Sequence, residues 1–168
     1  MSAIQSLAYQ YDARLIRLAR RYGITLLRIS VGIVFVWFGA LKLVPGLSPA
    51  EPLIRATLPF LPMNLFLPIL AIWEMAIGVG FIIGRWPRVT IALMLLQMGG
   101  AMSPIFLAPE MIFQQFPFVW TLEGQYVFKD IILIAAGIVI SAATVQRTTK
   151  STQEMKRLTS ELSLISRN

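Results

Sequence analysis

The chain contains no cysteine and no histidine among its 168 residues. It therefore has no thiolate nucleophile and no disulfide, and it lacks the imidazole and thiolate ligands by which proteins usually hold zinc and haem. Charged residues are also scarce, at 14 % of the chain, whereas a soluble domain carries about 25 %. These absences argue against an enzyme that performs redox or metal chemistry with its own side chains, and no catalytic residue is assigned.

Apolar residues take the place of the missing charge, since 57 % of the chain is hydrophobic and its mean hydropathy is +0.71. They form long unbroken runs, which favour helices over alternating strands, and each run is near the ~20 residues that cross a ~30 Å hydrocarbon layer. The predicted fold class is all-α, an integral membrane four-helix bundle preceded by an interfacial amphipathic helix. The candidate spans are Ile24–Val44, Leu65–Gly84, Arg88–Met102 (fading toward Ala108) and Val127–Val145.

Basic residues are distributed unevenly about these spans, within a net charge of +7. Twelve of the fifteen Lys and Arg lie on one side of the spans, and only Lys42, Arg55 and Lys129 lie on the other. The positive-inside rule then places both termini in the cytoplasm. We therefore expect three segments, namely a cytoplasmic interfacial helix (1–23), a four-span membrane domain (24–145) and a cytoplasmic polar tail (146–168).

The basic side is expected to face anionic lipid headgroups, and nucleic acid is not an expected partner. Within residues 1–23, apolar side chains share one helical face and arginines lie beside it, as in helices that lie in a membrane surface. Docking of a cytoplasmic protein is the alternative for this helix. The arginines expected at lipid headgroups are Arg14, Arg17, Arg21, Arg85 and Arg88.

One predicted span carries a carboxylate, Glu74, well inside it. At about 1.5 Å of rise per residue, Glu74 lies roughly 9 Å from the outer end of its helix and roughly 15 Å from the inner end. Gln97 lies at a similar depth on the next span, and Lys42 and Lys129 lie near the outer ends of the first and fourth spans. We therefore expect a hydrogen bond between Glu74 and Gln97, with Lys42 or Lys129 as the counter-charge of Glu74.

These groups predict a polar pocket that opens to the outer leaflet or the periplasm. Glu123 and Tyr126 are expected on its rim, and Trp37 and Trp73 are expected to form flat apolar walls. Ionisable groups at membrane depth are costly and usually functional, so Glu74 is interpreted either as a titrating or ligand-binding carboxylate or as half of a structural ion pair. For Glu123, Tyr126 and Lys129 the alternative is a cap that orients the start of the fourth span.

Four motifs carry a family likeness, namely Trp37–Lys42, Gly46–Glu51, Trp73–Gly78 and Thr121–Asp130. They resemble the DoxX-like four-helix membrane proteins, and most closely their YkgB-like branch. The resemblance implies a bacterial inner membrane and a role in respiration or in oxidative stress, especially reactive-chlorine stress, in some relatives beside a quinone-linked oxidoreductase. Such relatives often have a histidine where this chain has Gln97, so no metal, haem or proton-relay role is carried over.

Methionines recur every four residues on the third span, at Met94, Met98 and Met102. Thioethers bind Cu(I) and react with hypochlorite-type oxidants. A stripe of methionines is far more often packing material. Packing is therefore the favoured interpretation, and a copper site or an oxidant sensor is the alternative.

Small residues recur every four positions on the second span, at Ala76, Gly80 and Gly84. Such a ridge lets two helices approach closely in a membrane. We expect it to pack against another helix, either within the bundle or in a second copy of the chain.

Together these patterns predict a non-catalytic or accessory membrane subunit. It would bind a quinone-like small ligand or a partner oxidoreductase, in respiratory or oxidative-stress physiology. The alternatives are a small oligomeric transporter with Glu74 as its proton-coupling site, a quinone oxidoreductase subunit that needs an electron-carrying partner, and a purely structural subunit. The expected partners are membrane lipids together with another membrane protein or a second copy.

Overall fold

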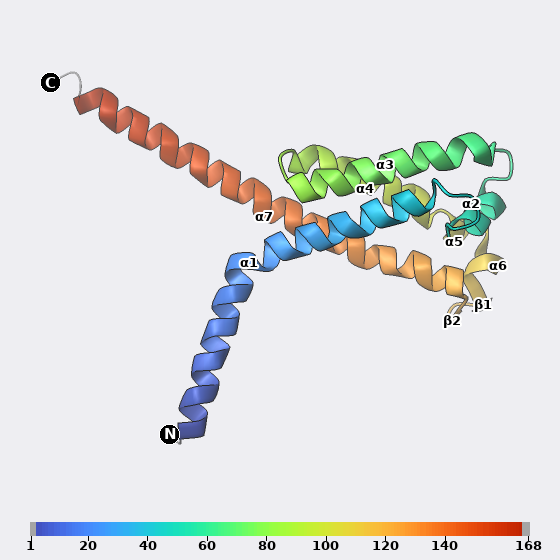
Figure 1. Cartoon of the computed structure of the whole chain (residues 1–168), viewed down its shortest axis with the longest axis horizontal. Helices are drawn as coiled ribbons and strands as arrows, with labels where there is room; N and C mark the ends of the chain where they lie inside the picture. The colour runs from blue at the N-terminus through green and yellow to red at the C-terminus, as the bar shows by residue number, and fades with distance from the viewer. Residues whose placement is uncertain (1–2, 166–168) are drawn as a thin grey trace.

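Within residues 3–165, the part of the chain that the computed structural model describes, four long helices run back and forth side by side (Figure 1). Each is long and apolar enough to cross a membrane, α4 together with the short α5 (Pro104–Leu107) that follows it. The predicted all-α membrane bundle of four spans is therefore confirmed. The long helices are α1 (Ala3–Leu41), α3 (Met63–Ile83), α4 (Pro87–Met102) and α7 (Leu122–Ile165).

Proline and glycine set the turn between α3 and α4. Gly84 follows α3 with φ +69°, and its N–H donates to the carbonyl of Gly80 at 2.9 Å, which is a left-handed glycine cap. Pro87 then begins α4 at a position where its missing N–H costs nothing. The turn makes α3 and α4 antiparallel neighbours.

Short elements gather at one end of the bundle, which we call the capped end (Figure 1). Two short strands, β1 (Phe113–Gln115) and β2 (Val119–Trp120), form an antiparallel hairpin there, in which Phe113 pairs with Trp120. The sequence did not predict this hairpin, because its aromatic residues pack on one another rather than alternating between a core and solvent. Besides α5, the capped end contains α2 (Glu51–Thr57), α6 (Pro109–Ile112), β1 (Phe113–Gln115) and β2 (Val119–Trp120).

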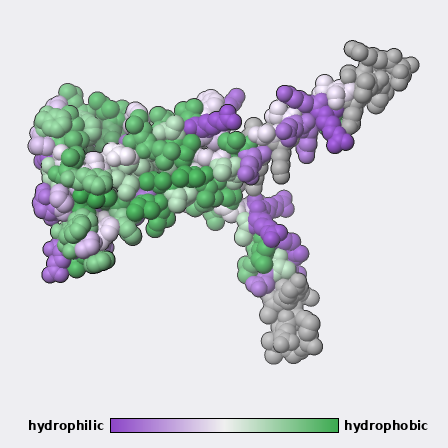
Figure 2. Space-filling view, turned by 180° about the vertical axis from the view of Figure 1, so that it is seen from behind, coloured by the Kyte–Doolittle hydropathy of each residue, from purple (hydrophilic) through white to green (hydrophobic). Residues whose placement is uncertain are grey.

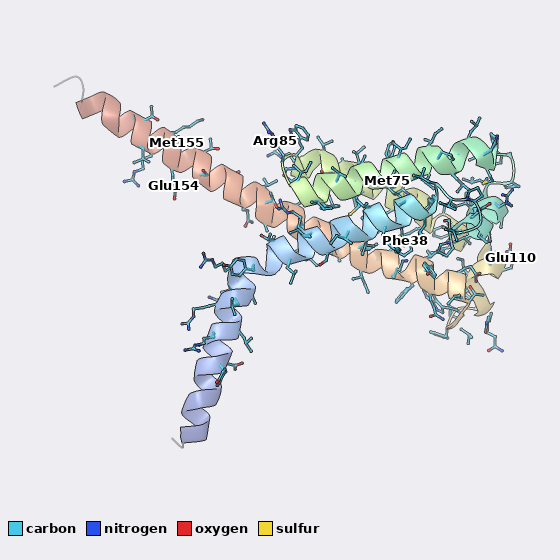
Figure 3. The ribbon with its side chains drawn as sticks, viewed as in Figure 1. Phe38, Met75, Arg85, Glu110, Glu154 and Met155 are labelled. Atoms are coloured by element: carbon cyan, nitrogen blue, oxygen red, sulfur yellow. The ribbon has the colours of Figure 1, made fainter. Side chains whose placement is uncertain are left out.

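The opposite end, which we call the basic end, has the α3–α4 turn with Arg85 and two helices that project from the bundle (Figure 3). The first part of α1 and the last part of α7 leave the bundle in different directions (Figure 1). Hydrophilic residues gather where these two segments leave the bundle, whereas the bundle surface is mostly hydrophobic (Figure 2). The predicted interfacial helix and tail are thus continuous with the first and fourth spans. Residues 1–2 and 166–168 of these two segments lie outside the described residues, and the segment boundaries stay a prediction.

The five arginines expected at lipid headgroups are all exposed at this basic end. Arg14, Arg17 and Arg21 lie on the projecting part of α1, and Arg85 and Arg88 flank the α3–α4 turn. Their contact with lipid stays a prediction.

Glycines let α1 and α3 approach until their backbones nearly touch. A Cβ atom added at Gly78 of α3 would lie 2.6 Å from the carbonyl oxygen of Gly32 in α1, and one added at Gly32 would lie 2.7 Å from the carbonyl oxygen of Gly78. Nearer the capped end, a Cβ at Gly39 would lie 2.9 Å from the carbonyl oxygen of Ala71. We call this contact the glycine seam.

The predicted ridge of small residues is not this seam. Ala76 is exposed, Gly80 packs against Thr90 of α4, and Gly84 caps α3 beneath the side chain of Arg28 from α1. The seam uses Gly78 instead, which lies on a different face of α3 from the ridge. A contact of Ala76 with a second copy of the chain stays untested.

The methionines of α4 lie in the interior. Met94 is fully buried and Met98 is 5 % exposed, both in the main core cluster, while Met102 packs against a smaller cluster at the capped end. This placement agrees with the packing interpretation. The main cluster is Val31, Phe35, Ile77, Phe81, Met94, Met98 and Ile140.

Candidate functional site

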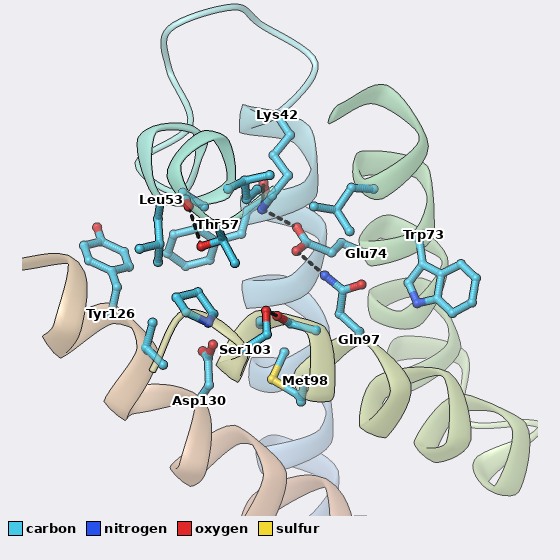
Figure 4. Close-up of a pocket in the computed structure, with 18 of the residues that line it drawn as sticks. Lys42, Leu53, Thr57, Trp73, Glu74, Gln97, Met98, Ser103, Tyr126 and Asp130 are labelled. Atoms are coloured by element: carbon cyan, nitrogen blue, oxygen red, sulfur yellow. Dashed lines mark hydrogen bonds and ion pairs between the residues drawn. The ribbon is translucent and has the colours of Figure 1, made fainter. Parts of the chain in front are cut away.

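Three polar side chains from three helices meet inside the bundle. The Nζ atom of Lys42, just after α1, lies 2.7 Å from Oε2 of Glu74 on α3. Gln97 of α4 donates from Nε2 to the other carboxylate oxygen, Oε1, at 2.8 Å (Figure 4). The side chains of Lys42 and Glu74 are 5 % and 10 % exposed. We call these three residues the polar triad.

The triad satisfies its buried charges locally. Each oxygen of Glu74 has one donor, and Lys42 also donates to the carbonyl of Phe38 at 3.4 Å. That carbonyl belongs to the last turn of α1, where the helix dipole favours a positive charge. Removing either member of a buried ion pair usually costs 3–5 kcal/mol, roughly, because the other charge stays buried. The triad therefore ties α1, α3 and α4 together.

A cavity of about 590 Å³ lies beside the triad, toward the capped end. Its volume is within the range of roughly 300–1,000 Å³ that is usual for small-molecule sites. Side chains from α1, α2, α3, α4, α5 and α7 line it, and most of them are apolar. The polar side chains of the lining are Lys42, Thr57, Glu74, Gln97, Ser103, Glu123, Tyr126, Lys129 and Asp130.

Lys129 lines the cavity but does not pair with Glu74. Its Nζ atom lies 3.9 Å from the centre of the Phe38 ring and 3.9 Å from that of Tyr126, which is cation–π geometry. The two rings meet edge to face at 6.2 Å. Glu74 pairs with Lys42 instead, at 2.7 Å. Of the two candidate counter-charges, the structure therefore selects Lys42.

The two predicted tryptophan walls have different outcomes. Trp73 borders the cavity, and its indole N–H donates to the carbonyl of Leu93 at 3.3 Å. Trp37 is 65 % exposed and is not part of the lining, so the prediction for Trp37 is wrong. The next residue, Phe38, faces the cavity instead, because consecutive residues of a helix point about 100° apart.

The predicted rim residues, Glu123 and Tyr126, both line the cavity. The cap of α7 is made by a different residue, Thr121, whose Oγ1 accepts from the N–H of Gly124 at 2.9 Å. That hydroxyl in turn donates to the carbonyl of Met111 at 2.5 Å, which fixes the start of α7 to α6. Glu123 is not needed for the cap.

Sequence reasoning missed Asp130 as a site residue. It points into the cavity from α7 (Figure 4). Tyr126, Val127 and Leu133 line the cavity from the same helix. Their spacing of three and four residues from Asp130 marks one helical face, which was the available signal.

No protein-family model, curated protein or solved structure matches this chain. The resemblance to DoxX-like proteins therefore stays a prediction. Function has to be argued from the site itself, because a fold alone does not fix it.

Proposed function

We propose that this chain is a non-catalytic membrane subunit that holds a quinone-like amphiphile in the cavity beside the polar triad. The observation that carries the proposal is a cavity of the size usual for small-molecule sites. Its lining is mostly apolar, and hydrogen-bond donors lie on one wall. Lys42 and Gln97 present N–H groups there, and ring carbonyl oxygens accept such bonds. The rings of Phe38 and Tyr126 provide apolar faces for a flat ligand.

The satisfied state of the triad supports binding rather than chemistry. Both oxygens of Glu74 accept hydrogen bonds from donors within the chain, Lys42 and Gln97, so the carboxylate is held in place between two helices. A group held in this way positions helices and ligands. The same ion pair also favours a second candidate, proton-coupled transport, in which it would open during each cycle. Glu74→Gln would then abolish flux in proteoliposomes.

We further propose that the protein lies in a bacterial inner membrane with its basic end in the cytoplasm. The support is the gathering of exposed arginines at the end where α1 and α7 project. A reporter fused after Lys150 is expected to read as cytoplasmic. The resemblance adds the proposal of an accessory role beside a quinone-linked oxidoreductase in respiratory or oxidative-stress physiology.

Tryptophan fluorescence tests ligand binding directly, because quinones quench indoles on contact. One protein keeps only Trp73, which borders the cavity, and a matched control keeps only Trp37, which faces outward. The remaining tryptophans become phenylalanine, and decylubiquinone is the probe in lipid nanodiscs. We expect saturable quenching of Trp73 and linear, partition-driven quenching of Trp37. Linear quenching of both would overturn the proposal.

A further inference from the structure

Asp130 has unused hydrogen-bonding capacity inside the cavity. It is half-buried on α7 and lines the cavity, and no donor of the described residues lies within hydrogen-bond or ion-pair distance of its carboxylate. The charged groups that act on it are Lys129 and Lys42, which attract it, and Glu74, which repels it.

Neither attracting lysine forms an ion pair with it. Lys42 is bound to Glu74 at 2.7 Å, and Lys129 lies between the rings of Phe38 and Tyr126.

Ser103, which lines the same cavity, does not supply a donor either. The hydroxyl of Ser103 donates its proton to the carbonyl of Gly100 at 2.7 Å, so its oxygen can only accept from a ligand. Figure 4 shows Lys42 and Glu74 in the upper part of the view and Ser103 and Asp130 below them. The cavity therefore presents donors at the triad and acceptors at Asp130 and Ser103.

We propose that Asp130 accepts a hydrogen bond from the head group of the ligand, so that the cavity selects a ring with a hydroxyl group. This inference rests on the proposed function and narrows it. A ring with two oxygens can then place an oxygen at the triad donors and a hydroxyl at Asp130. For a quinone-like ligand, the reduced, hydroxyl-bearing form binds more tightly than the oxidised form, which has only carbonyl acceptors.

Matched probes test this selection. 4-Hexylphenol and 4-hexylanisole differ by one methyl group that removes the donor. Each competes with decylubiquinone in the full-length protein that keeps only Trp73, and recovery of fluorescence reports displacement. A hydrogen bond to a charged acceptor predicts that the phenol binds about ten- to a hundredfold more tightly than the anisole.

Two variants test whether the carboxylate of Asp130 is the acceptor. Asp130→Leu removes the acceptor together with an unpartnered carboxylate, so the protein should fold, and the phenol should lose its advantage. Asp130→Asn keeps an amide oxygen as an acceptor, so a reduced preference of a few fold should remain.

The possible outcomes separate the two proposals. Equal affinity of phenol and anisole for the parent protein, with saturable decylubiquinone binding, would overturn the role of Asp130 and leave the proposed function standing. A preference for phenol that survives Asp130→Leu would also overturn it. Stronger displacement by n-hexylamine than by the phenol would assign the site to a cation instead. Absence of saturable decylubiquinone binding would remove the proposed function and this inference with it.

Discussion

The two sides of α3 pack in opposite ways, one with close backbone contact and the other around a cavity. Toward α1, the glycine seam brings backbone atoms almost into contact, and Ala71 and Ile77 are fully buried. Toward α4 and the capped end, larger side chains stand apart and enclose a cavity of about 590 Å³.

The difference separates two roles of one helix. In lipid, apolar side chains gain little by burial against one another, so close van der Waals contact between small residues holds helices together. The seam supplies that contact. The cavity side is held at its distance by the polar triad and by α2, α5 and α6 at the capped end. Variants of the seam should therefore damage the fold, and variants of the cavity should damage binding.

The largest expected effect is that of Gly78→Leu in the seam. The added side chain would meet backbone atoms of α1, which no rotamer change relieves, so we expect a loss of about 3 kcal/mol or more in unfolding free energy. Thermal and denaturant unfolding in detergent measure it. The control is Gly99→Leu on α4, where an added Cβ has nothing within 4 Å. Equal stability of the two variants would contradict the seam.

Glu74→Ala should have the next largest effect. It leaves the buried ammonium of Lys42 unpaired, and we expect a loss of roughly 3–5 kcal/mol in unfolding free energy. The double variant Lys42→Met with Glu74→Leu removes both charges and should recover most of that stability. Unchanged unfolding of Glu74→Ala would show that the ion pair does not hold the bundle.

Gly100→Leu should affect binding without affecting the fold. Gly100 lines the cavity at an exposed position with open space above it, and other exposed residues of the lining include Ile69, Leu96 and Leu107. A leucine there would narrow the opening toward lipid and weaken decylubiquinone binding about tenfold, ~1.4 kcal/mol. Gly99→Leu is again the matched control, because Gly99 is equally open but does not line the cavity. Equal binding by both variants would place the opening elsewhere.

The smallest expected effect is a pH dependence at the capped end. Hydrogen bonds from Arg55 at 2.8 Å and from the N–H of Gly46 lower the pKa of the Glu51 carboxyl below its ordinary value. Because the folded pKa is depressed, this stabilisation is present above the unfolded pKa and is lost as the pH falls through the folded pKa. The hydrogen-exchange protection factors of α2, which correct for the slower intrinsic exchange in acid, should therefore fall as the pH falls, and Glu51→Gln should remove that acid dependence. A fall of the same size in the variant would exclude Glu51 as its source.

The sequence predicted how deep a residue lies along its membrane helix, but it did not predict toward which neighbour the side chain points. The rise per residue placed Glu74 and Gln97 at a similar depth and Lys42 near the outer end of its span, and the contacts of Glu74 with Gln97 and with Lys42 were confirmed. Which way a residue points depends on how its helix is rotated in the bundle. All faces of a membrane helix are apolar, so the pattern does not fix that rotation. Trp37 was therefore assigned to the wall of the cavity in place of Phe38.

For a related reason, the sequence did not predict which residues of two helices pack against each other. The repeat of small residues every four positions predicted a helix contact at Ala76, Gly80 and Gly84. Gly78 makes the seam instead, because its partner Gly32 lies opposite it on α1. That match involves two helices and cannot be seen in either one alone. Asp130 was missed likewise, since its isolation from donors is a property of the assembled cavity.

The most direct test of the central claim is mass spectrometry of everything that co-purifies with the protein in mild detergent from its native membrane. The parent protein is compared with Gly100→Leu, and Gly99→Leu serves as the control. The cavity predicts a stoichiometric amphiphile with a hydroxyl-bearing ring in the parent and the control, and its depletion from Gly100→Leu. Identical bulk lipids in all three proteins, with no enriched small molecule, would contradict the account.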